Sequence, residues 1–134
     1  MSGFRLQIVT PDGSLFDGEA EALRVRTTEG YVSIRKDHAD YLAALDIGVV
    51  TVTQPQGKAR DAACGGGFLS VEKGEVRLVA TTFEYAEMID TERAEHAKSV
   101  AEQRIAAATE ARDIELAKAK LARALTRLNV ADRQ

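Results

Sequence analysis

The pattern of hydrophobic and polar positions divides the chain into two halves near Tyr85. Before this residue, apolar and polar side chains alternate over short runs, beginning with residues 4–9. After it, small and apolar residues recur every three or four positions. A period of two is typical of strands, and a period near 3.6 is typical of helices. The pattern therefore predicts a strand domain over 1–85 and a helical domain over 86–134.

The first half is predicted to hold many short strands joined by tight turns. Both prolines and all ten glycines lie in it, and these residues interrupt regular structure. The expected strands cover residues 4–9, 15–16, 22–28, 31–34, 47–53, 59–64, 68–71 and 76–80. Strands of this kind, repeated at about 8–12 residue spacing, indicate an antiparallel β-sandwich or barrel.

The second half is predicted to form two helices. Asp90 precedes the first periodic residues, and an aspartate there accepts a hydrogen bond from a free backbone amide. The period loses phase over 109–113, so a turn is expected there, with Thr109 or Asp113 as the next cap. The second helix carries a heptad-like apolar seam at Ile114, Ala117, Leu121, Ala124 and Leu128. An antiparallel hairpin of this size has little core of its own, which makes it a candidate moving part.

Composition excludes several classes of protein. The 134 residues suit one domain, or a small domain with an appendage, and the net charge of −3 argues against a nucleic-acid partner. Cys64 is the only cysteine, so neither an intramolecular disulfide nor a thiolate metal cluster is expected. The start of the chain lacks the apolar stretch of a signal peptide, and no apolar run is long enough to span a membrane. No direct membrane insertion is expected.

Charge is unevenly distributed along the helical half. Residues 87–115 carry eight acids and four bases, whereas residues 118–134 carry five bases and one acid. One interpretation is a solvated helix surface with cations gathered near a helix end, where the helix dipole favours them. The other is a basic arm that meets an acidic surface or phosphates.

Two motifs invite a chemical interpretation and fail it. Gly65–Gly67 is followed by Phe68 instead of the Lys-Ser/Thr of a phosphate loop, so a strand junction with closely passing backbones is the better interpretation. His38 lies between two aspartates, but no second ligand cluster sits at a recognised spacing. No serine or cysteine has the setting of a nucleophile. The sequence therefore predicts no metal site, no catalytic residues and no enzyme acting alone.

One set of polar residues does suggest binding chemistry. Glu84, Asp90 and Arg93 bracket the start of the first helix, and Arg123 and Arg127 share one side of the second helix near its end. In an antiparallel hairpin these two regions lie close together. Guanidinium groups suit phosphate, and carboxylates accept hydrogen bonds from an adenine amino group or ribose hydroxyls. The alternative is a mutual salt-bridge cluster, which stabilises little if exposed.

Five segments in the same order resemble the epsilon subunit of bacterial and chloroplast F-type ATP synthases. The resemblance covers essentially the whole chain and rests on Gln7–Gly13, Glu29–Ile34 with His38, Gly66–Leu69, Asp90–Ala94 and Leu121–Val130. It implies a flattened β-sandwich followed by a helical hairpin. One departure is the segment 35–37, Arg-Lys-Asp, where many members have Pro-Gly before the histidine.

The resemblance also implies a function. It indicates a non-catalytic subunit of the rotating central stalk, held at the cytoplasmic face of the bacterial membrane through the complex. The sandwich would bind the gamma subunit and sit on the ring of c subunits, with His38 in the loop that faces the ring, and would help to couple proton flow to ATP synthesis. No cofactor is implied.

The same resemblance implies a regulatory role for the hairpin. Extended along gamma, it would block rotation in the hydrolysis direction and place basic residues against an acidic loop of the beta subunit in the alpha-beta head; these positions are Lys118, Lys120, Arg123 and Arg127. In some members ATP binds the folded hairpin; the matching positions are Glu84, Asp90, Arg93, Arg123 and Arg127. A further basic residue of strong binders is replaced here by Val100.

The residues alone leave two other hypotheses open. The chain could be a stand-alone ATP-sensing module or adaptor, or an enzyme that uses His38 and its neighbouring acids. Co-purification with gamma and the head separates the stalk subunit from the stand-alone module. The enzyme requires turnover that is lost in His38→Ala.

Overall fold

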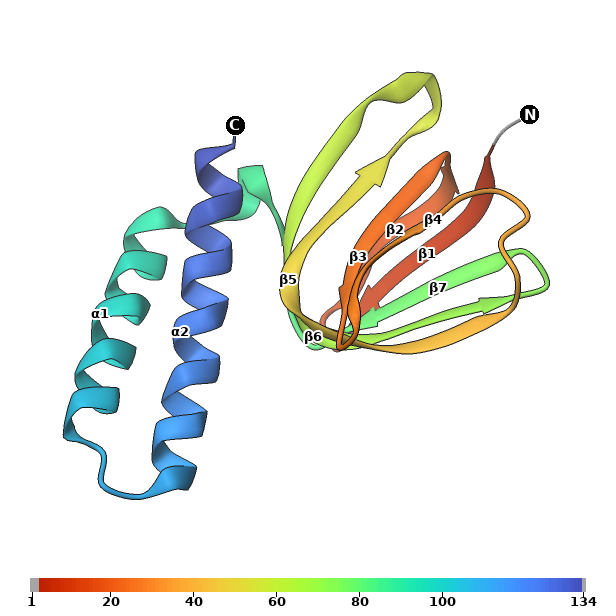
Figure 1. Ribbon diagram of the computed structural model, residues 1–134. Helices are drawn as coiled ribbons and strands as arrows, with labels where there is room; N and C mark the ends of the chain where they lie inside the picture. Colours follow the sequence, from red (N-terminus) through yellow and green to blue (C-terminus); the bar gives the residue numbers. More distant parts are fainter. Residues whose placement is uncertain (1–2, 134) are drawn as a thin grey trace.

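The computed structural model describes residues 3–133, and in them a strand domain is followed by two helices (Figure 1). The strands are β1 (Phe4–Thr10), β2 (Gly13–Ala20), β3 (Ala22–Thr27), β4 (Gly30–Ile34), β5 (Tyr41–Thr53), β6 (Ala59–Glu72), β7 (Glu75–Ala80) and β8 (Phe83–Tyr85). The helices are α1 (Thr91–Ala107) and α2 (Ala111–Asp132), and the 3-10 turns are η1 (Pro55–Gly57) and η2 (Ala86–Met88). The predicted fold class, a β-sandwich followed by a two-helix hairpin, is confirmed. Among the described residues, neither helix is long and apolar enough to cross a membrane.

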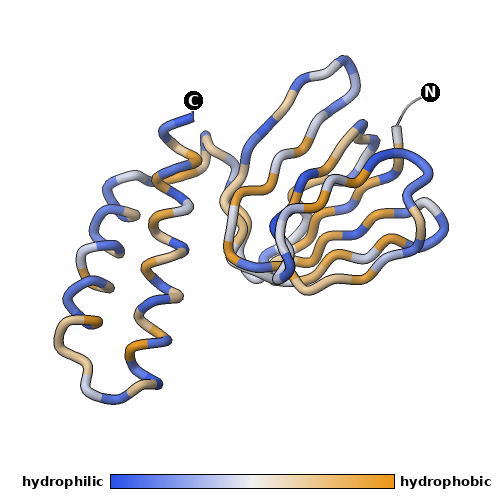
Figure 2. The backbone as a smooth tube through the Cα atoms, viewed as in Figure 1, coloured by the Kyte–Doolittle hydropathy of each residue, from blue (hydrophilic) through white to orange (hydrophobic). Residues whose placement is uncertain are grey.

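The strands form one strongly curved sheet whose inner face encloses the core. The order is β2-β1-β7-β6-β5-β3-β4, and β8 pairs with β6. Hydrophobic and hydrophilic residues alternate along the strands (Figure 2). Successive side chains of a strand lie on opposite faces of the sheet, and those on the inner face, such as Leu6, Ile8, Leu23 and Leu78, are fully buried. The prediction of antiparallel strands needs one correction. β1 and β7 pair in parallel. A long connection, which contains β2 to β6, separates them in the chain, and such a connection lets β7 return beside β1 in the same direction.

The two longest strands, β5 and β6, pair along their length and curve together, so that the single sheet folds over into the two layers of the sandwich (Figure 1). β6 runs without interruption through the glycines, where two separate strands were predicted, and it pairs first with β8 and then with β7. Gly67 has a φ of +141°, and a Cβ placed there would lie 1.9 Å from the carbonyl oxygen of Val79. Only glycine fits this conformation and this approach. The prediction that backbones pass closely at these glycines is therefore confirmed, although they do not end a strand.

The hairpin is antiparallel, and small residues line its seam. Ala94 and Ala101 of α1 and Ala117 and Ala124 of α2 are all buried, so the two helix backbones approach closely (Figure 1). The predicted cap at Asp90 is confirmed, because its Oδ1 accepts a hydrogen bond from the backbone amide of Arg93 at 3.1 Å.

The predicted cap of the second helix is wrong. α2 begins after Glu110, and among the described residues no side chain caps it. Thr109 lies in the turn before the helix, and Asp113 lies within its first turn. An acid in the first turn still interacts favourably with the helix dipole, which explains why the sequence signal resembled a cap.

The end of α2 rests on the sandwich, outside the main core. Val130 is fully buried and packs with Val49 of β5, Ala63 of β6 and two residues of the connecting segment, Ala86 and Ile89. These residues form a separate small apolar cluster. The hairpin is therefore folded against the sandwich, and its root and its far end lie side by side.

Candidate functional site

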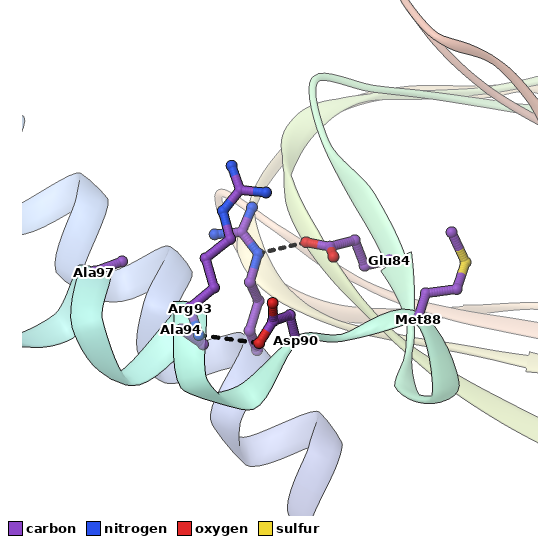
Figure 3. Close-up of a pocket in the computed structure, with 7 residues that line it drawn as sticks. Glu84, Met88, Asp90, Arg93, Ala94 and Ala97 are labelled. Carbon is purple, nitrogen blue, oxygen red and sulfur yellow. Dashed lines mark hydrogen bonds and ion pairs between the residues drawn. The ribbon is translucent and has the colours of Figure 1, made fainter.

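A cavity of about 350 Å³ lies where the sandwich meets the root of the hairpin (Figure 3). Three parts of the fold supply its walls: the end of the sandwich, the first turns of α1 and the last turns of α2. The lining residues are Glu84, Met88, Asp90, Arg93, Ala94, Ala97 and Arg127. The cavity thus forms only while the hairpin is folded.

An ion pair crosses from the sandwich to the hairpin at this cavity. The Nε atom of Arg127 donates to Oε1 of Glu84 at 2.6 Å. The two side chains are 26% and 32% exposed, so solvent screens the pair only in part. A short charge-assisted hydrogen bond in such a setting is stronger than one on an open surface.

The start of α1 supplies a second guanidinium and an open wall. Asp90 fixes the first turn through its cap, and Arg93 projects from that turn beside the cavity (Figure 3). Within the described residues no ion pair engages the Arg93 side chain, so its donors face solvent at the cavity. Ala94 and Ala97 leave room along the helix. The cavity therefore presents one engaged and one available guanidinium, which suits an anion with several oxygens.

The segment that joins sandwich to hairpin is held in place beside this cavity. The guanidinium of Arg60 lies 3.6 Å above the ring of Tyr85 and forms an ion pair with Glu87. Burial raises the pKa of the Tyr85 hydroxyl, against the opposing charge of Arg60. Hydrogen bonds from its own backbone amide and then from Arg60 lower the pKa of Glu87. The connecting segment is thus held against Arg60 of β6 through Tyr85 and Glu87.

Of the five residues proposed for nucleotide binding, the structure brings four around one cavity. These are Glu84, Asp90, Arg93 and Arg127. The described lining residues do not include Arg123, which is half-buried one turn earlier on α2.

The basic residues of α2 do not all share one side of the helix. At about 100° per residue, Lys120, Arg123 and Arg127 fall within an arc of about 60°, whereas Lys118 lies on the opposite side. Lys118 instead lies 3.8 Å from Glu115, three residues earlier on the same helix. The structure therefore groups three of these four cations and separates the fourth.

His38 lies elsewhere, on the loop between β4 and β5. Its Nδ1 is 2.7 Å from the carbonyl oxygen of Ala39, and its ring meets the edge of Tyr41 at 5.6 Å between centroids. No group of three metal-ligating side chains occurs in the part of the chain that the structure describes. His38 thus contacts its own loop and the start of β5.

Three lining residues were not anticipated from the sequence. Ala94 and Ala97 follow Asp90 at helical spacing, so a helix that begins at Asp90 places both on the same side as this residue. Met88 carries no such signal, because it lies on the turn η2 and its position depends on how the connection folds back. A second cavity of about 300 Å³ adjoins the first and shares Glu84, Met88 and Arg127 with it.

Comparison with known proteins identifies close similarities over the whole chain. Residues 3–86 match the family model described as ATP synthase, delta/epsilon chain, beta-sandwich domain, and residues 87–132 match the corresponding long alpha-helix domain. The ATP synthase epsilon chain of Shouchella clausii is 38% identical over 131 residues, 98% of this chain and 96% of that one. The ATP synthase epsilon chain of Ruminococcus albus is 36% identical over the full length of both chains.

Solved structures share the fold. A chain in the cryo-EM structure of the Euglena gracilis mitochondrial ATP synthase (OSCP, F1 and c-ring) aligns with a TM-score of 0.83 at 21% identity, over 98% of this chain and 82% of that one. A chain from the central stalk and c-ring of the Tetrahymena thermophila mitochondrial ATP synthase aligns with a TM-score of 0.66 at 13% identity, over 95% of each.

Proposed function

The chain belongs to the ATP synthase delta/epsilon family, and on that premise we propose that it is the non-catalytic epsilon subunit of the central stalk, with a hairpin that regulates ATP hydrolysis. The whole-length match to epsilon chains supports the assignment. The sandwich would bind gamma and the c-ring, with the His38 loop toward the ring, and so couple proton flow to ATP synthesis at the cytoplasmic face of the membrane.

The partners are tested by affinity purification of the tagged chain. A stalk subunit is expected to bring down gamma and the alpha-beta head together with c subunits. Recovery of the chain alone, under conditions that keep the synthase intact, would favour the stand-alone ATP-sensing module.

ATP is proposed as the ligand that holds the hairpin folded. The observation that carries this proposal is the cavity at the hairpin root, where Arg93 and Arg127 lie with Glu84 and Asp90. The guanidiniums would bind phosphate oxygens, and the carboxylates would accept from the amino group or the ribose hydroxyls. Because the walls come from both domains, ATP would bind only the folded form and shift the population toward it. Arg123, one turn away on the same side of α2, is proposed as an additional phosphate contact.

Titration of the purified full-length chain with ATP tests this site. Amide shifts are expected to concentrate at the start of α1 and the end of α2. Arg93→Ala and Arg127→Ala should each weaken binding, whereas Lys118→Ala, an equal loss of charge on the opposite side of α2, should leave it unchanged. The absence of saturable shifts at millimolar ATP, or equal effects of all three substitutions, would refute the site.

The brake on hydrolysis is proposed to use the same side of α2. In the folded form Arg127 is engaged by Glu84. Once the hairpin detaches, Lys120, Arg123 and Arg127 would together face the acidic loop of the beta subunit. Lys118 was proposed with them, but it lies on the opposite side of the helix and is expected to contribute least.

Hydrolysis by the assembled complex tests the brake. Deletion of residues 86–134 should raise ATP hydrolysis while the complex still assembles. Lys120→Glu with Arg123→Glu should have a similar effect, and Lys118→Glu should have little. Unchanged hydrolysis after the deletion would reject the brake, and loss of assembly would show that the hairpin is structural.

A further inference from the structure

We infer that the last turn of α2 is a latch that docks the hairpin on the sandwich without any nucleotide, and that the latch sets how tightly the proposed ATP site binds. The first part rests on the contacts of Val130 and Arg133 alone. The second part rests on the proposed function.

The seat of the latch is built from two neighbouring cross-strand pairs. Val49 of β5 lies opposite Ala63 of β6, and Thr51 lies opposite Asp61. Residues two apart on a strand share a face, so all four side chains belong to the outer face of these strands. The seat is therefore half apolar and half acidic.

The acidic half of the seat is oriented by a hydrogen bond within the sandwich. The Thr51 hydroxyl donates to Oδ1 of Asp61 at 2.6 Å. This hydrogen bond orients the carboxylate and leaves its other oxygen available, and the guanidinium of Arg133 lies 3.6 Å from that Oδ2 atom. Asp61 thus acts as a positioned acceptor for the end of α2.

The apolar half of the seat receives Val130. This side chain is 0% exposed, although it lies four residues from the end of the chain, and it packs on Val49 and Ala63. Arg127, Val130 and Arg133 are spaced by three, so they lie along one side of the last turns. Each of the three meets a different sandwich residue. The helix end therefore has its own attachment, distinct from the α1–α2 seam.

The latch and the nucleotide cavity are separate in their side chains. The described lining residues of the cavity include neither Val130 nor Arg133. A change at the latch alters the fraction of chains in the folded form and leaves the cavity itself intact. Because apparent affinity scales with the fraction of the competent form, a weaker latch weakens ATP binding at a distance.

Spin-label distances in the full-length chain test the latch without nucleotide. Labels are placed at the exposed positions Ser33 and Glu102, on sandwich and hairpin, in a Cys64→Ser background. The parent is expected to show one narrow distance. Val130→Asp is expected to shift most of the population to longer, broader distances. Leu125→Asp, the same change at an exposed site of α2, should keep the narrow distance.

A charge swap on the surface tests whether the longer distances come from release of the latch and not from unfolding of the chain. Arg133→Glu should increase the long-distance population, and adding Asp61→Arg should restore the narrow distance. Val130→Asp with a distance unchanged from the parent, or no rescue by the swap, would overturn the latch.

ATP titration of the same samples tests the second part. Val130→Asp should weaken the apparent affinity at least about tenfold, and saturating ATP should restore the narrow distance. If Val130→Asp binds ATP as tightly as the parent does, the coupling is refuted. If the parent binds no ATP, the proposed nucleotide function fails, and the distances without nucleotide still decide the latch.

Discussion

The Glu84–Arg127 ion pair offers a quantitative test of the folded hairpin. The Nε–Oε1 distance is 2.6 Å, and most of each side chain is covered, with 26% and 32% exposed. Exposed ion pairs contribute less than about 1 kcal/mol to folding stability, whereas hydrogen bonds to charged groups contribute about 1.5–3 kcal/mol. A partly covered pair should lie between these limits. The expected coupling energy is about 1–1.5 kcal/mol.

A double-mutant cycle measures this energy directly. Glu84→Gln, Arg127→Gln and the double variant are unfolded in urea, and the transition is followed by helical circular dichroism, which reports mainly the hairpin. The double variant should lose less stability than the sum of the losses of the two single variants. Each single variant leaves one charged side chain without its partner, and the double variant does not. Raising the salt concentration should reduce the coupling only in part, since the pair is partly buried.

A coupling energy within about 0.3 kcal/mol of zero would refute the reasoning. It would mean that Glu84 and Arg127 do not form this ion pair in solution. The cycle of Lys118 with Glu115, an exposed pair at 3.8 Å within α2, provides the control and should give a value near zero.

Three further predictions concern the sheet, the start of α1 and the segment that joins them. Gly67→Ala should lower the free energy of unfolding by at least about 2 kcal/mol, measured in urea, because the new Cβ would lie 1.9 Å from the carbonyl oxygen of Val79; an unchanged midpoint would contradict the bend. Asp90→Ala should cost about 1 kcal/mol, seen as faster amide exchange in the first turn of α1; exchange at the parent rate would contradict the cap. The pKa of Glu87 is lowered by its backbone amide and Arg60, so the stabilisation that Glu87 contributes is present above the ordinary pKa of a carboxyl group and is lost as the pH falls through the lowered value. Urea unfolding of the parent at a series of acid pH values should show this loss of stability, and Glu87→Gln should show a smaller one. Identical pH profiles of the two proteins would contradict the prediction.

The division into a strand domain and a hairpin could be predicted because each half has its own hydrophobic period. Glycine and proline are confined to the first half, and the heptad-like seam of α2 becomes the side buried against α1. The start of α1 could be placed from Asp90, since a cap is a local interaction. Local signals of this kind need no knowledge of the rest of the fold.

The strand details could not be predicted, because they depend on partners far away in the sequence. β5 begins at Tyr41, but Leu42 is exposed and the alternation is weak there, so only 47–53 was predicted. β8 has three residues and exists because β6 changes partner at its bend. The parallel pairing of β1 with β7 likewise follows from the closure of the sheet.

The candidate site was predictable as far as the antiparallel hairpin determines it. That hairpin brings Arg127 back to Arg93, and both line the cavity. The pairing of Arg127 with Glu84 and the position of Arg123 outside the cavity depend on how α2 rotates against the sandwich, which no sequence period fixes. The same rotation determines the seat of Val130.

The central proposal is that the hairpin, which folds on the sandwich, must leave it to stop hydrolysis. Cysteines at Ala63 and Val130, which pack together in the folded form, can be oxidised to a reversible tether in the assembled synthase. With the tether closed, ATP hydrolysis should rise to the level of the 86–134 deletion, and reduction should restore inhibition. Hydrolysis that remains inhibited while the tether is closed would contradict the account.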